Sequence, residues 1–214
     1  MLVRDRMSKN PYTVTADTSI SDALTRMREA RVRRLPVLDK SGQLVGIVAE
    51  KDLLYASPSP ATSLSIWEIH TLLAKLTVAE VMKKEIVSVA EDTPVEDAAR
   101  IMTDRKIGSL LVLRDGHLVG IITESDLFKL FQELLGARKQ GVRLTILLPE
   151  VKGTLARITA AIAQQGGYTH ALSTFLGEDP TNFVLTMKVA DVPKDRLVAT
   201  LKPLALEIID VRET

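Results

Sequence analysis

One short pattern occurs twice in this chain, as Gly46-Ile47-Val48-Ala49-Glu50-Lys51-Asp52 and as Gly120-Ile121-Ile122-Thr123-Glu124-Ser125-Asp126, seventy-four positions apart. In both copies the glycine follows a Leu-Val pair, an apolar strand comes to its end, and an aspartate closes the turn before a helix. A repeat of this length indicates a duplicated structural unit, and the copies of such a unit often form a site where they meet. The function is therefore to be sought between two similar halves.

The composition restricts the kind of protein. The 214 residues suit two compact domains, or one domain with a substantial extension. The 28 basic and 27 acidic residues are nearly balanced, which gives no broad attraction to nucleic acid or to an anionic membrane. The chain has no cysteine, so disulfides, thiolate metal sites and cysteine nucleophiles are excluded. Since the start is charged and no apolar run approaches the roughly 20 residues of a membrane helix, we expect a soluble cytoplasmic protein.

The first repeat, residues 1–56, predicts the order strand, helix, strand, hairpin, strand, helix. A β-prone run at 12–15 precedes a helix whose apolar residues follow i, i+3, i+4, i+7 spacing, with Thr18 or Asp17 as the N-cap. The next strand, 35–38, contains Pro36, which has no amide hydrogen to donate. This proline favours an edge position or the beginning of the strand.

The rest of the first repeat predicts a hairpin and a closing helix. The residues at 39–42 have turn chemistry, and 44–48 predict the return strand. We expect a helix to open after Asp52, because Leu53 and Leu54 begin an apolar face there.

The second repeat, residues 78–135, follows the same order. Met7 matches Met82 and Met27 matches Met102, each seventy-five positions apart. Residues 93–96 form a capping-box pattern with proline at the first helical position, which predicts a helix start. Between the repeats, 57–77 combines a Pro/Ser-rich tether with an amphipathic helix at 66–73, in which Trp67 is expected to pack or to contact another subunit rather than a ligand.

Residues 142–214, after a short linker at 136–141, share nothing with the repeats and predict a separate domain. Its order is a strand at 142–148, a helix carrying Leu155, Ile158 and Ile162, two strands around a turn at 177–180, a second helix and a last strand. This βαββαβ order is the ferredoxin-like arrangement.

The aspartate of the repeated pattern has the chemistry of a ribose contact. A carboxylate at a helix start can accept hydrogen bonds from both vicinal hydroxyls of a ribose, and a hydroxyl three residues earlier can reach the sugar or first phosphate. Asp126 with Thr123 meets both requirements, whereas Asp52 has Ala49 in place of the hydroxyl. A lost hydrogen bond of roughly 0.5–1.5 kcal/mol weakens a site by up to about tenfold, so the Thr123/Asp126 cleft ranks as the better nucleotide site. The alternative is that both aspartates only cap helices.

Two arginines are candidates for phosphate binding. Arg33 and Arg34 precede Leu35, where the second repeat has Gly108 and Ser109. Guanidinium groups bind phosphate oxygens bidentately, so the first repeat would supply charge and the second the ribose contact. The alternative is a solvated basic edge. The complete set of expected nucleotide-binding residues, including apolar strand ends that would sandwich the base, is Ile86, Val87, Ile107, Ser109, Thr123, Asp126, Asp52, Arg33 and Arg34.

The residue patterns required for metal binding, for catalysis and for binding single-stranded nucleic acid do not occur in this sequence. The three histidines, His70, His117 and His170, have no metal-ligand spacing, and we expect no metal site. The chain has neither a Gly-x-x-x-x-Gly-Lys-[Ser/Thr] phosphate loop nor a Gly-x-Ser-x-Gly elbow. It also has no basic-aromatic platform for single-stranded nucleic acid. We therefore expect no catalytic residues and no enzyme.

The two repeats closely resemble a tandem pair of CBS domains, the module named after cystathionine β-synthase. The resemblance covers residues 3 to about 135 and rests on the duplicated pattern, including Leu35-Pro36-Val37-Leu38 and the Gly-x-x-[Ser/Thr]-x-x-Asp motif. It implies a mixed α/β fold of two β-α-β-β-α repeats in a pseudo-two-fold pair, with a cleft on either side. It further implies a homodimer of such pairs, and adenosyl ligands such as AMP, ADP, ATP or S-adenosylmethionine, with no required cofactor.

The third segment resembles an ACT domain, a regulatory module that often binds amino acids where two copies pair. The loop from Pro149 to Leu155 matches the family's segment before the first helix, with Lys152 where proline is usual. The order of a CBS pair followed by an ACT domain resembles the bacterial acetoin-utilisation CBS–ACT proteins, which implies a role connected to acetoin catabolism.

These observations favour a non-enzymatic regulatory protein that senses an adenosyl ligand and acts on a regulated partner. The segment from Leu127 to about Arg138 is expected to be a helix that connects the better site to the third domain. The alternative is a structural dimerisation adaptor with vestigial clefts, which the Ala49 substitution favours. A third possibility, an enzyme such as a nucleotide phosphohydrolase, has no general base or metal cluster to support it.

Overall fold

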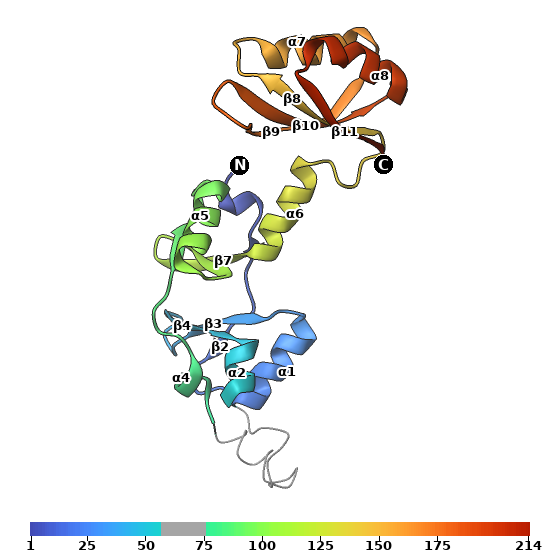
Figure 1. The fold of residues 1–214 in the computed structure, drawn as a ribbon. Helices are drawn as coiled ribbons and strands as arrows, with labels where there is room; N and C mark the ends of the chain where they lie inside the picture. Colours follow the sequence, from blue (N-terminus) through green and yellow to red (C-terminus); the bar gives the residue numbers. More distant parts are fainter. Residues whose placement is uncertain (57–75) are drawn as a thin grey trace. The chain divides into compact units, whose positions relative to one another are not determined.

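The computed structural model describes residues 1–56 and 76–214, which form two compact units, Met1–Leu127 and Phe128–Thr214 (Figure 1). The expected tether at 57–65 and the expected helix at 66–73 with Trp67 lie outside the described residues. The boundary between the units falls within one helix, α6.

The first unit contains both repeats. In chain order its elements are η1 (Val3–Asp5), β1 (Ser8–Lys9), β2 (Val14–Thr15), α1 (Ile20–Ala30), β3 (Arg34–Leu38), β4 (Leu44–Ala49), α2 (Glu50–Ala56), α4 (Val78–Val81), β5 (Ser88–Ala90), α5 (Val95–Arg105), β6 (Ser109–Arg114), β7 (His117–Thr123) and α6 (Glu124–Leu134). They build one sheet of order β2-β3-β4 and one of order β1-β7-β6-β5. In each repeat the first strand pairs parallel to the second, and the hairpin strands pair antiparallel. The expected β-α-β-β-α order is therefore present twice.

The segment before each repeat packs on the other repeat. The amide of Val3 donates to the carbonyl of Thr93 (2.8 Å), and the equivalent amide of Val78 donates to the carbonyl of Thr18 (2.9 Å). In the same way β1 pairs with β7, and Lys83 forms a β-bridge with Ile47 of β4. Val78 consequently belongs to the buried core of the first repeat. This reciprocal exchange ties the two copies together, and local sequence patterns did not predict it.

The glycine that opens the repeated pattern is required by this exchange. A Cβ on Gly46 would lie 2.8 Å from the Met82 sulfur and 3.0 Å from the Lys83 carbonyl oxygen. A Cβ on Gly120 would meet the sulfur of Met7 in the same way and would lie 3.1 Å from the Ser8 carbonyl oxygen. Because protein interiors are close-packed, a side chain at either position would displace the crossing segment. The repeated glycines and repeated methionines thus have one common structural reason.

Two expected helix starts are wrong by one residue. Helix α1 is capped by Ser19, whose Oγ accepts from the Asp22 amide (3.0 Å), rather than by Thr18 or Asp17. Thr18 instead accepts from the Thr15 amide (3.1 Å) in the preceding turn. Helix α5 begins at Val95, and its N-cap is Pro94, whose side chain has no hydrogen-bond acceptor. The Val95 amide donates to the Met1 carbonyl (3.2 Å) through the exchange.

Two further expectations need correction. Strand β3 is central rather than an edge, but its ladder with β2 begins only at Val37, so the missing amide of Pro36 is not needed there. Helix α2 begins at Glu50 rather than after Asp52, which places Asp52 in its first turn. Asp126 has the same place in α6.

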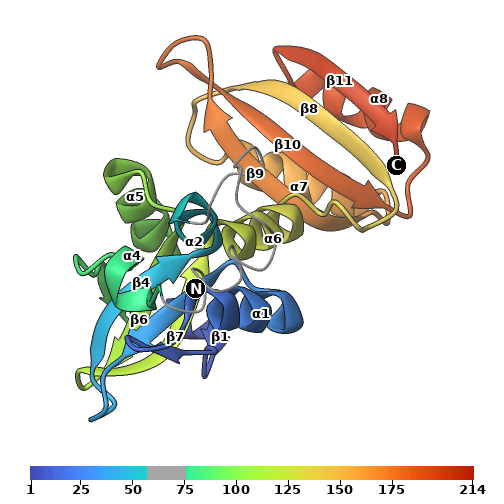
Figure 2. The same cartoon turned by 90° about the horizontal axis from the view of Figure 1, so that it is seen from below.

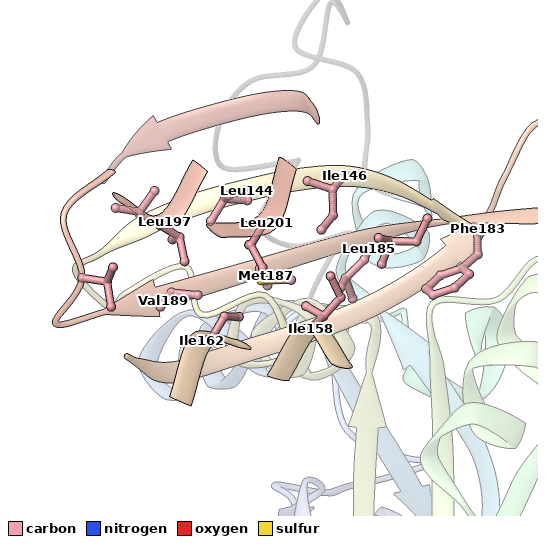
Figure 3. Close-up of a cluster of buried hydrophobic side chains, with 13 residues drawn as sticks. Leu144, Ile146, Ile158, Ile162, Phe183, Leu185, Met187, Val189, Leu197 and Leu201 are labelled. Carbon is pink, nitrogen blue, oxygen red and sulfur yellow. The ribbon is translucent and has the colours of Figure 1, made fainter. Parts of the chain in front are cut away.

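The second unit has the βαββαβ order that its sequence predicts. Its elements after α6 are β8 (Val142–Pro149), α7 (Thr154–Gln164), β9 (Tyr168–Leu176), β10 (Asn182–Ala190), α8 (Lys194–Leu201), η2 (Lys202–Leu204) and β11 (Glu207–Glu213). The antiparallel sheet has the order β11-β8-β10-β9, and helices α7 and α8 cover one of its faces (Figure 2). Between them lies an apolar core in which Leu144, Ile158 and Leu185 are fully buried (Figure 3).

Helix α6 ends earlier than expected, at Leu134 rather than near Arg138. Gly136 follows with φ of 61°, and the Ala137 amide donates to the Gln132 carbonyl (2.9 Å). A glycine in the left-handed conformation with such a bond is a common helix end.

Candidate functional site

A cleft of about 120 Å³ lies between the two repeats of the first unit. Its lining comes from both copies: Arg34, Ile47, Ala49, Lys51, Asp52, Lys83, Glu85, Val87, Lys106, Ile107, Gly108, Ser109 and Leu111. Sites that enclose a whole small ligand usually measure roughly 300–1,000 Å³. This cleft therefore encloses only part of a nucleotide-sized molecule, and the remainder would lie at its solvent-exposed mouth.

The backbone at the end of β4 positions the first-repeat side of the cleft. The amide of Glu50, the first residue of α2, donates to the Arg33 carbonyl (3.0 Å), which holds the helix start against the beginning of β3. Asp52 follows in the first turn, half-buried, with Ala49 beside it. In the described part of the chain no hydrogen bond engages the Asp52 carboxylate. It is the acceptor within this cleft that a ribose could use.

The second-repeat side is built in the same way. The Glu124 amide, at the start of α6, donates to the Gly108 carbonyl (3.2 Å). Gly108 has space only for hydrogen on its open side: a Cβ there would lie 2.5 Å from Arg34 Nη2 and 2.7 Å from Glu124 Oε2. The guanidinium of the first repeat therefore reaches over Gly108 of the second, close to the Glu124 carboxylate.

The Thr123/Asp126 pair is engaged with itself. Asp126 Oδ2 accepts from the Thr123 amide (3.0 Å) and from the Thr123 hydroxyl (2.7 Å). A side chain in the third helical position that accepts from the N-cap amide is half of a capping box. Asp126 thus takes part in capping α6 from the third helical position rather than as its N-cap, and a ligand that took the Thr123 hydroxyl would compete with this bond.

The structure brings five of the nine expected nucleotide-binding residues to one cleft: Arg34, Asp52, Val87, Ile107 and Ser109. Ile86 is half-buried next to Val87, and Arg33 is exposed with its carbonyl bound by the Glu50 amide. Neither lines this cleft, nor do Thr123 and Asp126. The ranking of the Thr123/Asp126 cleft over the Asp52 cleft remains a prediction.

Three cationic residues of the cleft were missed by the sequence reasoning: Lys51, Lys83 and Lys106. Lys106 directly precedes Ile107, and Lys83 directly follows Met82, which matches Met7. Their positions next to Ile107 and Met82, which the sequence analysis names, could have identified Lys106 and Lys83 as residues of the cleft. Lys83 reaches the first repeat only because its segment is exchanged, with bonds to Ile47 of 2.9 and 3.0 Å.

A polar hollow of about 270 Å³ lies where the N-terminal segment meets the second repeat. Arg114 donates to both carboxylate oxygens of Glu91 at 2.6 Å. This hydrogen bonding, more than the additional attraction of Arg4 and Lys9, holds the pKa of Glu91 below its ordinary value. The pair occurs in one copy only, because the position equivalent to Glu91 in the first repeat is Ala16.

A larger open groove of about 1080 Å³ lies in the second unit, between the loop after β8 and the turn that joins β9 to β10. Thr154 begins α7 there, and its hydroxyl donates to the Val151 carbonyl (2.8 Å). Apolar side chains on the rim are exposed, Leu176 by 96% and Phe175 by 47%. The loop from Pro149 to Leu155 singled out in the sequence is thus one wall of a groove.

Within 1–56 and 76–214, no group of three or more His, Asp or Glu side chains is arranged to hold a metal ion. None of the helices described is long and apolar enough to cross a membrane.

Comparison with known families gives a match over both repeats. Residues 3–59 and 78–133 match the family model for the CBS domain. Together these segments make up more than half of the chain.

Three solved structures are similar to this chain. The CBS domain pair of protein MJ0100, in complex with 5′-methylthioadenosine and S-adenosyl-L-methionine, is 30% identical with a TM-score of 0.52, covering 65% of this chain and 98% of that one. CBSX2 in complex with AMP is 34% identical with a TM-score of 0.52, covering 62% and 97%. AcuB of Vibrio cholerae, named as an acetoin utilization protein, is 32% identical with a TM-score of 0.53, covering 64% and 95%.

Proposed function

The chain belongs to the CBS-domain family, and on this premise we propose that it is a regulatory protein that binds an adenosyl ligand between its two repeats. The observation that carries the proposal is the composition of the cleft. The Asp52 carboxylate from one repeat faces a space also lined by the apolar strand-end residues Val87 and Ile107 from the other. An acceptor for ribose hydroxyls beside apolar walls for a flat base is the chemistry of a nucleoside site. CBS pairs of similar sequence hold AMP in one case and methylthioadenosine with S-adenosylmethionine in another.

The duplication suggests a second cleft of the same design. Arg34 and Ser109 are equivalent in the two repeats, and both line the cleft described above. The counterpart cleft would therefore use the same two residues together with Thr123 and Asp126 in place of Ala49 and Asp52. Arg33 and Ile86 would contribute to these two sites as the sequence predicts.

The proposed output is a change in how the first unit acts on the rest of the protein or on a regulated partner. Helix α6 starts with the Thr123/Asp126 motif and continues across the boundary into Phe128–Thr214. A ligand that prefers one arrangement of this helix start would shift the populations of the two arrangements, with coupling of about 1–3 kcal/mol in typical systems. In this role the protein needs binding residues and no catalytic ones.

Titration calorimetry tests the proposal. The full chain is titrated with AMP and with adenosine, alongside Asp52→Ala, Asp126→Ala and Arg34→Ala. We expect saturable binding of AMP, weakened at least tenfold in an aspartate variant, and a larger loss for AMP than for adenosine in Arg34→Ala. Equal losses for both ligands would reject the phosphate role of Arg34. Absence of binding at millimolar concentration by the folded protein would reject the sensor.

We propose further that the second unit is an ACT domain and that the protein is a homodimer. The βαββαβ order and the groove beside the loop from Pro149 to Leu155 support the first point. The exposed apolar side chains Leu54, Tyr55, Phe128 and Phe131, on the equivalent helices α2 and α6, support a subunit contact. Similarity to AcuB of Vibrio cholerae supports a connection to acetoin catabolism.

The adaptor function is favoured by different observations. The cleft is small, Ala49 lacks the hydroxyl of the pattern, and Thr123 and Asp126 satisfy each other. An adaptor would dimerise through the same apolar helix residues without a ligand. A ligand-dependent rise in melting temperature, which arises when a ligand binds only the folded state, would argue against it.

A further inference from the structure

The cleft between the repeats carries more positive than negative charge. Four of its lining residues are cationic, Arg34, Lys51, Lys83 and Lys106, and two are anionic, Asp52 and Glu85. The Glu85 side chain is 89% exposed, and its carboxylate lies 4.0 Å from the guanidinium of Arg105. Since Arg105 does not line the cleft, this contact partly offsets the charge of Glu85 without using a cation of the cleft. Asp52 is the acceptor assigned to ribose. The groups left for the rest of a ligand are therefore mainly cations.

The three lysines are placed by three separate backbone elements. Lys51 lies in the first turn of α2. Lys83 is held by its β-bridge to Ile47. Lys106 caps the end of α5 in the left-handed conformation, with φ of 52°. Since both repeats contribute and the exchange brings Lys83 across, the positive charge is a property of the paired repeats rather than of one exposed helix face.

Among these cations, Arg34 lies close to the Glu124 carboxylate beside Gly108, and the three lysines differ from it. Across residues 1–56 and 76–214, no ion pair joins Lys51, Lys83 or Lys106 to a carboxylate. Because the enclosed volume is about 120 Å³, a base can be enclosed while the groups attached to its ribose extend to the mouth, where these three exposed lysines lie. Phosphates at the mouth would meet unpaired ammonium groups, whereas a cationic sulfonium there would be repelled.

We infer that this cleft selects adenosyl ligands by negative charge and that its ligand is a nucleoside di- or triphosphate rather than a neutral or cationic adenosyl compound. The inference rests on the proposed function and names the ligand class of that site. By this inference the ligand of this chain differs in charge from the ligands of the MJ0100 pair, which holds methylthioadenosine and S-adenosylmethionine. Since an exposed pair contributes modestly, three lysines are expected to make ATP bind about 10- to 100-fold more tightly than adenosine.

The test is titration calorimetry of the full chain with adenosine, AMP, ADP, ATP and S-adenosylmethionine. The buffer has low salt and contains EDTA, so that neither counterions nor magnesium screen the phosphates. The variants are the double change Lys83→Gln with Lys106→Gln, the control Lys84→Gln, and Asp52→Ala. Lys84 is an exposed neighbour that does not line the cleft.

The expected affinity order is ATP, ADP, AMP and adenosine, with S-adenosylmethionine weakest. The double variant should lose most of the preference for ATP and leave adenosine unchanged, and the control should behave as wild type. Asp52→Ala should weaken every ligand, which assigns the binding to this cleft.

If S-adenosylmethionine or adenosine binds as tightly as ATP, or the double variant weakens all ligands equally, the charge selection is wrong and the sensor proposal stands. If Asp52→Ala leaves ATP binding unchanged, the assignment to this cleft is wrong. If no adenosyl ligand binds, both proposals are wrong.

Discussion

Asp52 and Asp126 occupy the same place in two copies of one structural unit, yet their surroundings differ. Asp126 accepts two hydrogen bonds from Thr123, at 3.0 and 2.7 Å, and so stabilises the start of α6. Asp52 follows Ala49, which has no hydroxyl, and its carboxylate lines a cleft. Duplication preserved the backbone position of the carboxylate, while a single neighbouring side chain changed what the carboxylate contacts. Equivalent residues in a repeat therefore require separate assignments of role.

The largest effect on stability is expected from disrupting the packing that the two repeats share, in which a methionine of the exchanged segment crosses the glycine of the repeated pattern. Gly46→Ala and Gly120→Ala should each destabilise the protein by about 1–3 kcal/mol, because the added methyl group overlaps the crossing methionine. Urea unfolding measures the free energy in each variant. Each glycine should couple only to the methionine that crosses it, Met82 for Gly46 and Met7 for Gly120.

A double-mutant cycle provides the control. Met7→Ala should relieve Gly120→Ala and leave Gly46→Ala as it was, and Met82→Ala should do the reverse. Coupling between cognate residues should exceed about 0.5 kcal/mol, and coupling between mismatched residues should stay below it. Equal coupling in all four combinations would contradict the exchanged packing.

A smaller difference in stability should distinguish alanine substitutions of the two aspartates. Asp126→Ala removes the acceptor of the Thr123 amide and hydroxyl, and should cost about 0.5–2 kcal/mol in the free energy of unfolding. Asp52→Ala, where the described residues offer no such bond, should change stability by less than about 0.5 kcal/mol. Chemical unfolding without ligand measures both. A larger loss in Asp52→Ala than in Asp126→Ala would reverse the comparison.

The smallest effect concerns an ion pair present in the second repeat only. Because the pKa of Glu91 is lowered from its ordinary 4.5 by the bonds from Arg114, the stability it contributes is complete above pH 4.5 and is lost as the pH falls through the lower, folded-state pKa. The melting temperatures of wild type and Glu91→Gln should therefore differ at pH 7 and converge in acid. Glu96→Gln, at an exposed position of α5, serves as the control. A difference that stays constant from pH 7 to pH 3 would contradict this role of Glu91.

Much of the local structure could be predicted because it depends on short-range patterns. Alternation and helical spacing located the strands and helices of both repeats and the complete βαββαβ order of the second unit. Errors occurred where a distant segment altered a local preference. Helix α5 begins one residue later than the pattern at 93–96 predicts, with Pro94 as its N-cap and the Val95 amide bound to the Met1 carbonyl. Pro36 is accepted in a central strand because β2 pairs only beyond it.

The sequence by itself determined the duplication, the CBS-domain family and the positions of the two aspartates, since each of these is written in spacing along the chain. Only the tertiary structure decided that the segment before each repeat packs on the other repeat, and that Lys83 and Lys106 join Asp52 at one cleft. The physical reason is that these contacts join residues far apart in the chain. Which carboxylate is engaged in a helix start and which lines a cleft likewise depends on the neighbours that packing supplies. The charge of the cleft, and with it the ligand class we infer, belongs to the folded pair.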